Sequence, residues 1–152
     1  NGILDKRAGV THTYDMAEEI HGDGTGMING KIYDIKRMKD LAPDIIRQRM
    51  IVEGTLKASF DPLEMVGYCR EITDVLKMTQ VSAPFCSHDS KYGWCAYMHW
   101  KESGIHIYSW NTRKPPFFSI DIYTCKVFNE SDVIEFTKIF FGNRLIDLSW
   151  KE

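Results

Sequence analysis

The stretch from Tyr92 to Cys125 constrains the fold most, because apolar and polar residues alternate along it as they do in β-strands. In its first half Ile105 and Ile107 alternate with polar residues, and after a turn-forming segment the second half alternates again. Successive side chains of a strand point to opposite faces, so each predicted strand has one apolar and one polar face. The stretch therefore predicts neighbouring antiparallel strands that cover a core with one face only.

The rest of the chain adds two amphipathic helices to this sheet. Asp61 followed by Pro62 is a typical helix start, and Gly142 is typical of a helix end. Periodicity predicts helices over 61–78 and 129–141, and strands over 50–56, 79–85, 92–100, 102–110, 117–125 and 145–150. Helices that cover one face of a mainly antiparallel sheet make a two-layer α+β sandwich.

The N-terminal third carries weaker signals. We interpret residues 1–48 as an N-terminal arm with a helical extension, and residues 49–152 as the main domain. The glycine-rich segment 21–30 indicates a flexible arm or a loop that clasps a second subunit. Apolar residues at three- and four-residue spacing predict a helix over 31–49, interrupted at Pro43.

Charge and composition argue against several classes of protein. The net charge of −2, from 19 Lys and Arg against 21 Asp and Glu, provides no basic excess for nucleic acid. No apolar run approaches the ~20 residues that a membrane span needs, and no secretory signal is recognisable, so we expect a cytoplasmic protein. The four cysteines form no zinc-binding pattern, so we expect free thiols and no metal site.

Reactive side chains gather on the two central predicted strands. Ser103, His106 and Tyr108 belong to one strand, and Asp121 and Cys125 to the next. A hydroxyl, an imidazole, a phenol, a carboxylate and a thiol on adjacent strands are typical of a catalytic site.

Short motifs from about Arg49 to the C-terminus, roughly two-thirds of the chain, carry a family resemblance. They are Ile51-Val-Glu53, Tyr92-Gly93, Glu102-Ser103, Trp110 and Ser119-Ile-Asp121-Ile-Tyr-Thr124-Cys125. Together they resemble the short prokaryotic S-adenosylmethionine decarboxylases, which are small α/β sandwiches that cleave themselves to make a pyruvoyl cofactor. The Glu-Ser step alone is uninformative, whereas its combination with the Trp and with Asp-x-x-Thr-Cys is moderately specific.

The resemblance implies a reaction and gives several residues a role. The Ser103 hydroxyl would attack the carbonyl of Glu102, and cleavage at Glu102-Ser103 would activate the precursor and turn Ser103 into the pyruvoyl group. Cys125 would return a proton to the product, and His106 or Tyr108 would assist the cleavage.

The resemblance also implies a substrate and an oligomer. The substrate would be S-adenosylmethionine, in polyamine biosynthesis, or a basic amino acid such as ornithine or arginine. The residues expected to line the substrate site are Glu53, Phe85, Trp110 and Asp121. By analogy we expect a homo-oligomer, most simply a homodimer, with a surface formed by Tyr97, Trp100, Trp110 and Tyr123.

Strict alternation sets a geometric requirement on this site. Ser103 shares the apolar side of its strand with Ile105, whereas Cys125 falls on the polar side of the next strand. We expect a bulge or turn near Gly104 to bring the two together.

The chain departs from the family pattern where self-processing and nucleoside binding are concerned. Gly104 stands where the family has a His, Tyr108 replaces a processing His, and Cys95 replaces a processing Ser. The segment Trp110-Asn111-Thr112 lacks the acidic residue that holds the ribose. Two other interpretations therefore stay open: a non-processing relative that binds a small molecule or a partner protein, and an unrelated α+β domain.

Overall fold

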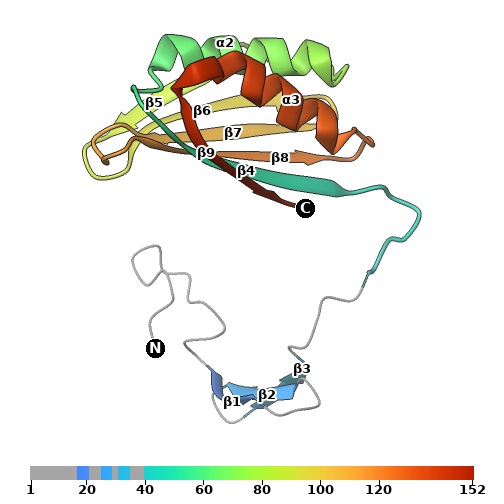
Figure 1. Ribbon diagram of the computed structural model, residues 1–152. Coiled ribbons are helices and arrows are strands. Elements are labelled where there is room, and N and C mark those ends of the chain that lie inside the picture. The colour runs from blue at the N-terminus through green and yellow to red at the C-terminus, as the bar shows by residue number, and fades with distance from the viewer. Residues whose placement is uncertain (1–16, 21–24, 29–30, 35–39) are drawn as a thin grey trace. The chain divides into compact units, whose positions relative to one another are not determined.

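The computed structural model describes residues 17–20, 25–28, 31–34 and 40–152, and the chain divides into two compact units, 1–43 and 44–152 (Figure 1). The first unit contains an antiparallel sheet of β1 (Ala17–Ile20), β2 (Thr25–Ile28) and β3 (Lys31–Asp34), in that order. The division after Pro43 lies a few residues before the boundary that we placed at residue 48.

The helix predicted over 31–49 is wrong wherever the structure describes it. Residues 31–34 form β3, residues 40–47 contain no helix, and Gln48 already begins β4 (Gln48–Leu56). Residues 35–39 of this prediction lie outside the described residues. The short alternation in Lys31-Ile-Tyr-Asp34 fits a strand equally well, and Pro43 disfavours the helix that was counted across it.

The second unit contains a six-stranded antiparallel sheet covered by two helices (Figure 1). The strand order is β5-β6-β7-β8-β4-β9, with β5 at Phe85–Asp89, β6 at Gly93–Trp100, β7 at Ser103–Trp110, β8 at Phe117–Thr124 and β9 at Leu145–Lys151. The helices α2 (Pro62–Val75) and α3 (Glu130–Phe141) lie on one face, and a short 3-10 helix, η2 (Gly142–Arg144), leads into β9. The predicted α+β sandwich is confirmed.

Local sequence signals set the ends of both helices. Asp61 accepts a hydrogen bond from the backbone N–H of Glu64, and the Glu64 side chain accepts one from the N–H of Asp61, which completes a capping box. Gly142 ends α3 with a φ of 56°, a conformation that glycine adopts without strain. These caps fix the directions in which the chain enters and leaves the helical layer.

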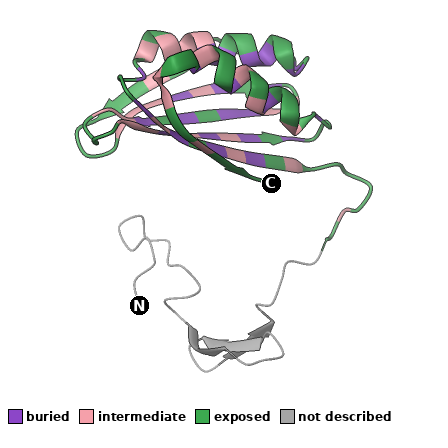
Figure 2. Ribbon diagram, in the orientation of Figure 1, coloured by how far each residue is buried: buried purple, intermediate pink, exposed green. Residues whose placement is uncertain are grey.

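The core lies between the sheet and the helices (Figure 2). The inward residues of the central strands, such as Ile105 and Ile107, are fully buried. Trp100 is fully buried as well, and its indole N–H donates to Thr73 Oγ1 at 2.8 Å. Its predicted place on a dimer surface is therefore wrong, because it belongs to the inner face of the sheet.

The strand predicted over 79–85 lies later in the chain. Residues 79–84 contribute only an isolated bridge between Gln80 and Trp100, and β5 starts at Phe85. Residues 86–89, which follow the predicted strand, belong to β5 as well. The Pro84 ring cannot donate to a ladder, which explains why regular pairing begins only after it.

Candidate active site

The sheet face opposite the helices carries most of the predicted site residues. Within the described part of the chain this face carries no helix, and we call it the open face. Cross-strand pairing places a row of six side chains on it: Phe85, Tyr97, His106, Asp121, Ile51 and Lys151. The next row consists of Ser87, Cys95, Tyr108, Ser119, Glu53 and Ser149. Residues paired across neighbouring strands point to the same face, and the two rows lie two residues apart along each strand.

A cavity of about 310 Å³ at one end of the open face brings three predicted site residues together. Ser103, His106 and Asp121 line it, together with Tyr97, His99, Gly104 and Tyr123. Ser103 is the first residue of β7, directly after the turn at Lys101 and Glu102. The cavity thus places the predicted pyruvoyl precursor beside an imidazole and a carboxylate.

The backbone at Ser103 adopts a φ of 135°, which is rare for a residue with a side chain. Strain of this kind costs on the order of 1–3 kcal/mol and is concentrated at functional sites. Of the bulge or turn that we predicted near Gly104, the structure has a turn at Lys101 and Glu102 and no bulge. Ser103 pairs with Trp100 and Thr124, and the register continues without a shift on both sides of β7. The unusual conformation is thus confined to Ser103 itself.

Gly104 is required by a close approach of its neighbours. A Cβ atom at this position would lie 2.7 Å from the carbonyl oxygen of Met98 and 3.2 Å from the hydroxyl of Tyr97. The space that a side chain would need at residue 104 is therefore occupied by β6.

The peptide that precedes Ser103 is held from two sides. The backbone N–H of Cys125 donates to the carbonyl oxygen of Glu102 at 2.9 Å. The Glu102 carboxylate accepts hydrogen bonds from the N–H of Thr79 at 2.8 Å and from its hydroxyl at 3.0 Å. The Thr79 N–H in particular lowers the pKa of Glu102 below its ordinary value. Both carboxylate oxygens are thereby tied to the segment that follows α2.

His106 and Asp121 face each other across β7 and β8. Partial burial lowers the pKa of His106 below its ordinary value, although the negative charge of Asp121 acts in the opposite direction. Arg49 holds Asp121 with two hydrogen bonds, from Nε to Oδ1 at 2.9 Å and from Nη2 to Oδ2 at 2.6 Å. This bidentate pair fixes the Asp121 carboxylate. Because its pKa is lowered, the His106 imidazole favours its neutral form.

Cys125 lies one residue beyond Thr124, the cross-strand partner of Ser103. The Cys125 thiol is exposed. Cys125 does not belong to the described lining of the Ser103 cavity. All four cysteines are free thiols, and Cys69 is a buried core residue on α2.

The remaining predicted residues lie elsewhere on the open face. The Tyr108 ring stacks on His106, with ring centres 5.8 Å apart, and burial raises the pKa of its hydroxyl. Trp110 borders a separate cavity of about 310 Å³ with Arg113 and Phe117. Phe85 is 65% exposed on the edge strand β5. Tyr108, Trp110 and Phe85 do not belong to the described lining of the Ser103 cavity.

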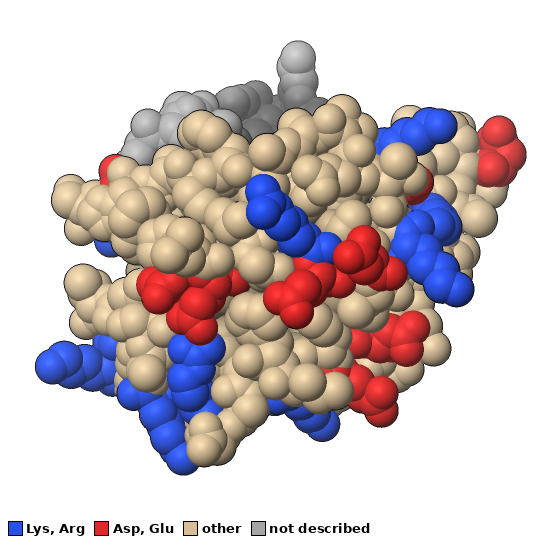
Figure 3. Space-filling view, turned by 90° about the horizontal axis from the view of Figure 1, so that it is seen from above, with Lys and Arg blue, Asp and Glu red and all other residues tan. Residues whose placement is uncertain are grey.

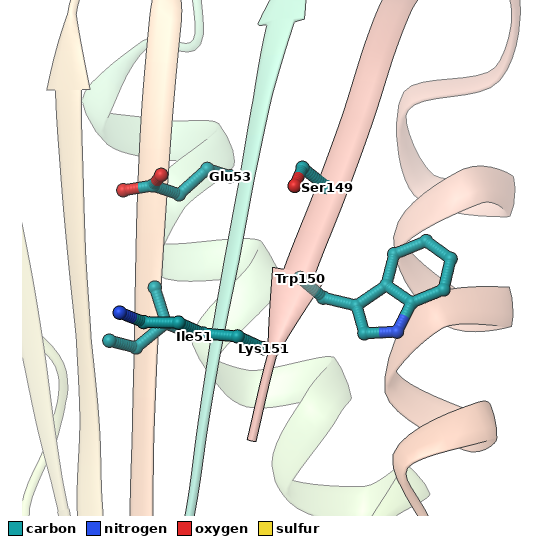
Figure 4. Close-up of a pocket in the computed structure, with 5 residues that line it drawn as sticks. All are labelled: Ile51, Glu53, Ser149, Trp150 and Lys151. Carbon is teal, nitrogen blue, oxygen red and sulfur yellow. The ribbon is translucent and has the colours of Figure 1, made fainter.

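Glu53 lines a third cavity, of about 230 Å³, at the β9 edge of the sheet (Figure 4). Its carboxylate accepts a hydrogen bond from Ser119 Oγ at 3.0 Å. Ser149 and Lys151 lie beside it, whereas the Trp150 side chain points away from the cluster (Figure 4). Glu53 is therefore two strands away from Ser103, since β8 lies between β4 and β7.

Sequence reasoning missed four residues that surround Ser103. Tyr97 and His99 line the cavity, Arg49 anchors Asp121, and Thr79 binds Glu102. Tyr97 and His99 alternate with the apolar Met98, so the period of the strand could have placed them on the open face. The contacts of Arg49 and Thr79 depend on tertiary structure and leave no local signal.

Other classes of site find little support in the structure. Within the described ranges, no group of three or more His, Cys, Asp and Glu residues could hold a metal ion. Among the same residues, no helix is long and apolar enough to cross a membrane. On the helix-covered side, acidic and basic side chains are interspersed (Figure 3).

Comparison with known protein families finds one match. The model of the S-adenosylmethionine decarboxylase family matches residues 57–149, which is more than half of the chain and includes α2, α3 and the strands of the Ser103 cavity. A search of curated proteins finds no match. The chain therefore belongs to the S-adenosylmethionine decarboxylase family.

Proposed function

We propose that this protein is a pyruvoyl-dependent decarboxylase that activates itself by cleaving the bond between Glu102 and Ser103. Membership of the family supports a carboxy-lyase that depends on a pyruvoyl group. The observation that carries the proposal is the geometry of the bond itself. Ser103 has a strained φ of 135° on the wall of a cavity, and a backbone N–H already binds the carbonyl oxygen of Glu102.

Self-cleavage uses groups that the structure places around this bond. The Ser103 hydroxyl attacks the Glu102 carbonyl carbon, and the Cys125 N–H, 2.9 Å from the carbonyl oxygen, stabilises the negative charge that develops there. Rupture of the C–N bond leaves an ester between Glu102 and the Ser103 side chain. Elimination then releases Glu102 as a free carboxylate, and hydrolysis of the resulting dehydroalanine expels ammonia and leaves the pyruvoyl group.

The residues around Ser103 fit such a group. The carboxylate of Asp121, fixed by Arg49, and the rings of Tyr97 and Tyr123 form walls suited to a cationic amine substrate. A pyruvoyl carbonyl supplies an electron sink for the loss of carbon dioxide from a bound amine. The chain itself must orient the amine in the cavity and deliver a proton afterwards.

We assign that proton delivery to the Cys125 thiol. Cys125 follows the cross-strand partner of Ser103, and its thiol is exposed toward solvent. A thiol can give a proton to a carbanion and regain one from water. His106, whose pKa is lowered, and Tyr108, which stacks on it, are the candidates that assist cleavage from the open face.

Two substrate classes remain in the proposal, and each has its own support. The family supports S-adenosylmethionine, the precursor of polyamine synthesis. The segment Trp110-Asn111-Thr112 supports a smaller basic amino acid such as ornithine or arginine, because it offers no carboxylate to hold the hydroxyls of a ribose. Carbon dioxide release from each labelled substrate distinguishes the two, and Ser103→Ala must abolish it.

We further propose that the open face is the interface of a homodimer. It exposes large aromatic side chains, with Phe85 at 65%, Tyr123 at 45% and Tyr108 at 36% exposure. It also carries both signs of charge, in Asp121 and Lys151, so a two-fold axis can bring complementary groups together. A second copy of the chain would cover an aromatic surface that a monomer leaves in water.

A further inference from the structure

We propose that Tyr97 and His99 form the proton-transfer pair that serves Ser103 during self-cleavage. This inference rests on the proposed function, because it concerns the step that breaks the Glu102–Ser103 bond. The inference adds to the proposed function a pair of residues on β6, a strand in which sequence analysis found no catalytic candidate.

The pairing of β6 with β7 places both residues opposite the residues that follow Ser103, while Ser103 itself pairs with Trp100. His99 pairs with Gly104, and Tyr97 pairs with His106. Residues 97 and 99 are two apart on one strand, so their side chains share the open face. Both line the same cavity as Ser103.

Gly104 lets the Tyr97 hydroxyl reach this end of β7. A Cβ at residue 104 would stand only 3.2 Å from the Tyr97 hydroxyl oxygen and 3.2 Å from its Cε1 atom. The phenol therefore fills the space over the residue that is bonded directly to Ser103. A larger residue at 104 would displace it, which gives Gly104 a functional reason beyond backbone packing.

Tyr97 and His99 are coupled to each other. The Tyr97 hydroxyl and His99 Nδ1 are 3.1 Å apart, and the two rings stack at 27° with centres 6.4 Å apart. A phenol alone is a poor base at neutral pH, whereas an imidazole accepts a proton in that range. In the tautomer with an unprotonated Nδ1, Tyr97 donates to His99 and can pass a proton on to it.

The step balances without any further reagent. Ser103 Oγ–H gives its proton to the Tyr97 oxygen while the Tyr97 proton moves to His99 Nδ1. The Oγ–C bond to Glu102 forms, and the C–N bond between Glu102 and Ser103 breaks. The proton then returns from His99 through Tyr97 to the Ser103 nitrogen, which becomes the amine of the ester intermediate.

Several other groups face the pair and must be considered in any pH measurement. His106 packs on the Tyr97 ring, with centres 4.4 Å apart, and Asp121 and Tyr123 line the same cavity. Arg49 is bound to Asp121. The contribution of His99 is therefore separated from that of His106 by substituting each one in turn.

The test follows cleavage of freshly synthesised full-length chain over time, by denaturing gel and intact mass. Tyr97→Phe removes only the hydroxyl, and His99→Gln keeps a hydrogen-bond acceptor but takes up no proton. Tyr92→Phe is the matched control, because Tyr92 is 47% exposed and lies before β6, outside the described lining of the cavity. Circular dichroism and thermal unfolding establish that each variant is folded.

We expect both cavity variants to cleave at least about 10²-fold more slowly, in the range that general acid–base groups contribute, and the control to cleave like the wild type. We also expect His99→Gln to change the pH–rate profile in a way that His106→Gln does not. Folded Tyr97→Phe or His99→Gln that cleaves at the wild-type rate overturns this inference alone. A wild-type chain that never cleaves overturns it together with the proposed function.

Discussion

The backbone amide of Cys125 donates a hydrogen bond to the carbonyl oxygen of Glu102 across a distance of 2.9 Å. This contact lies just beyond the last paired residues of β7 and β8, Ser103 and Thr124. It joins the carbonyl that must be attacked to the residue whose thiol is expected to act later. One residue can therefore take part in two steps through different atoms, its N–H in cleavage and its sulfur in the decarboxylation.

Substitution of Cys125 separates these two steps. Cys125→Ala keeps the amide and removes the thiol, so we expect cleavage within about twofold of the wild-type rate and decarboxylation slowed by about 10²-fold or more. Gel analysis measures the first step, and release of labelled carbon dioxide measures the second. Full decarboxylase activity in the cleaved variant would exclude the thiol as the proton donor.

Gly104 should not tolerate even one additional methyl group. The new Cβ in Gly104→Ala would lie 2.7 Å from the Met98 carbonyl oxygen, so the backbone must move, at a cost of about 1–3 kcal/mol in unfolding free energy. Gly67→Ala is the matched control, because the nearest atom to its Cβ is 3.7 Å away and the site is helical. Urea unfolding should show the control stabilised by about 0.5–1 kcal/mol. Equal stability of the two variants would contradict the packing at β6.

The ionisation of His106 should depend on Asp121 in a defined direction. Burial lowers the pKa of His106 and the Asp121 carboxylate raises it, so Asp121→Asn should lower it further. The pKa of His106 in the folded state lies below the unfolded value of about 6.5, so at pH values near 6.5 the unfolded chain binds more protons than the folded one. This residue therefore lowers the free energy of unfolding as the pH drops through that range. An NMR titration of the imidazole measures the midpoint. A midpoint that rises in the variant would contradict the arrangement.

The open face should determine the oligomeric state. Tyr108→Asp places a charge in the centre of the proposed interface, and burying an unpaired charge there should shift the protein toward monomer. Leu63→Asp is the control, since Leu63 is 84% exposed on α2, on the helical side. Light scattering should find wild type and control dimeric and the open-face variant monomeric. A monomeric wild type would contradict the interface.

The sequence predicts the second unit well because its signals are local. The capping box at Asp61 and Glu64 and the alternation through Ile105 and Ile107 each act within a few residues, and the structure contains the elements that they predict. The helix expected over 31–49 is wrong because spacing was counted across Pro43. Asn29-Gly30, a dipeptide typical of hairpin turns, was a better signal for strands in that region.

The site was predictable in part. Alternation places His106 and Asp121 on one face, and the structure brings both to the Ser103 cavity. The positive φ of Ser103 and the contact of Thr79 with Glu102 come from tertiary packing between β7 and the segment after α2, which no period in the sequence reports. We predicted a bulge or turn near Gly104; the structure has a turn at Lys101 and Glu102 and a close approach of Tyr97 to Gly104.

The mass of the purified chain tests the central claim most directly. Intact mass spectrometry, before and after prolonged incubation, should find one fragment that ends at Glu102 and a second that begins at the former Ser103 and resists Edman sequencing. Ser103→Ala should remain a single full-length chain under the same conditions. A wild-type protein that also stays full-length would contradict self-activation and would favour a relative that binds a small molecule or a partner without cleaving itself.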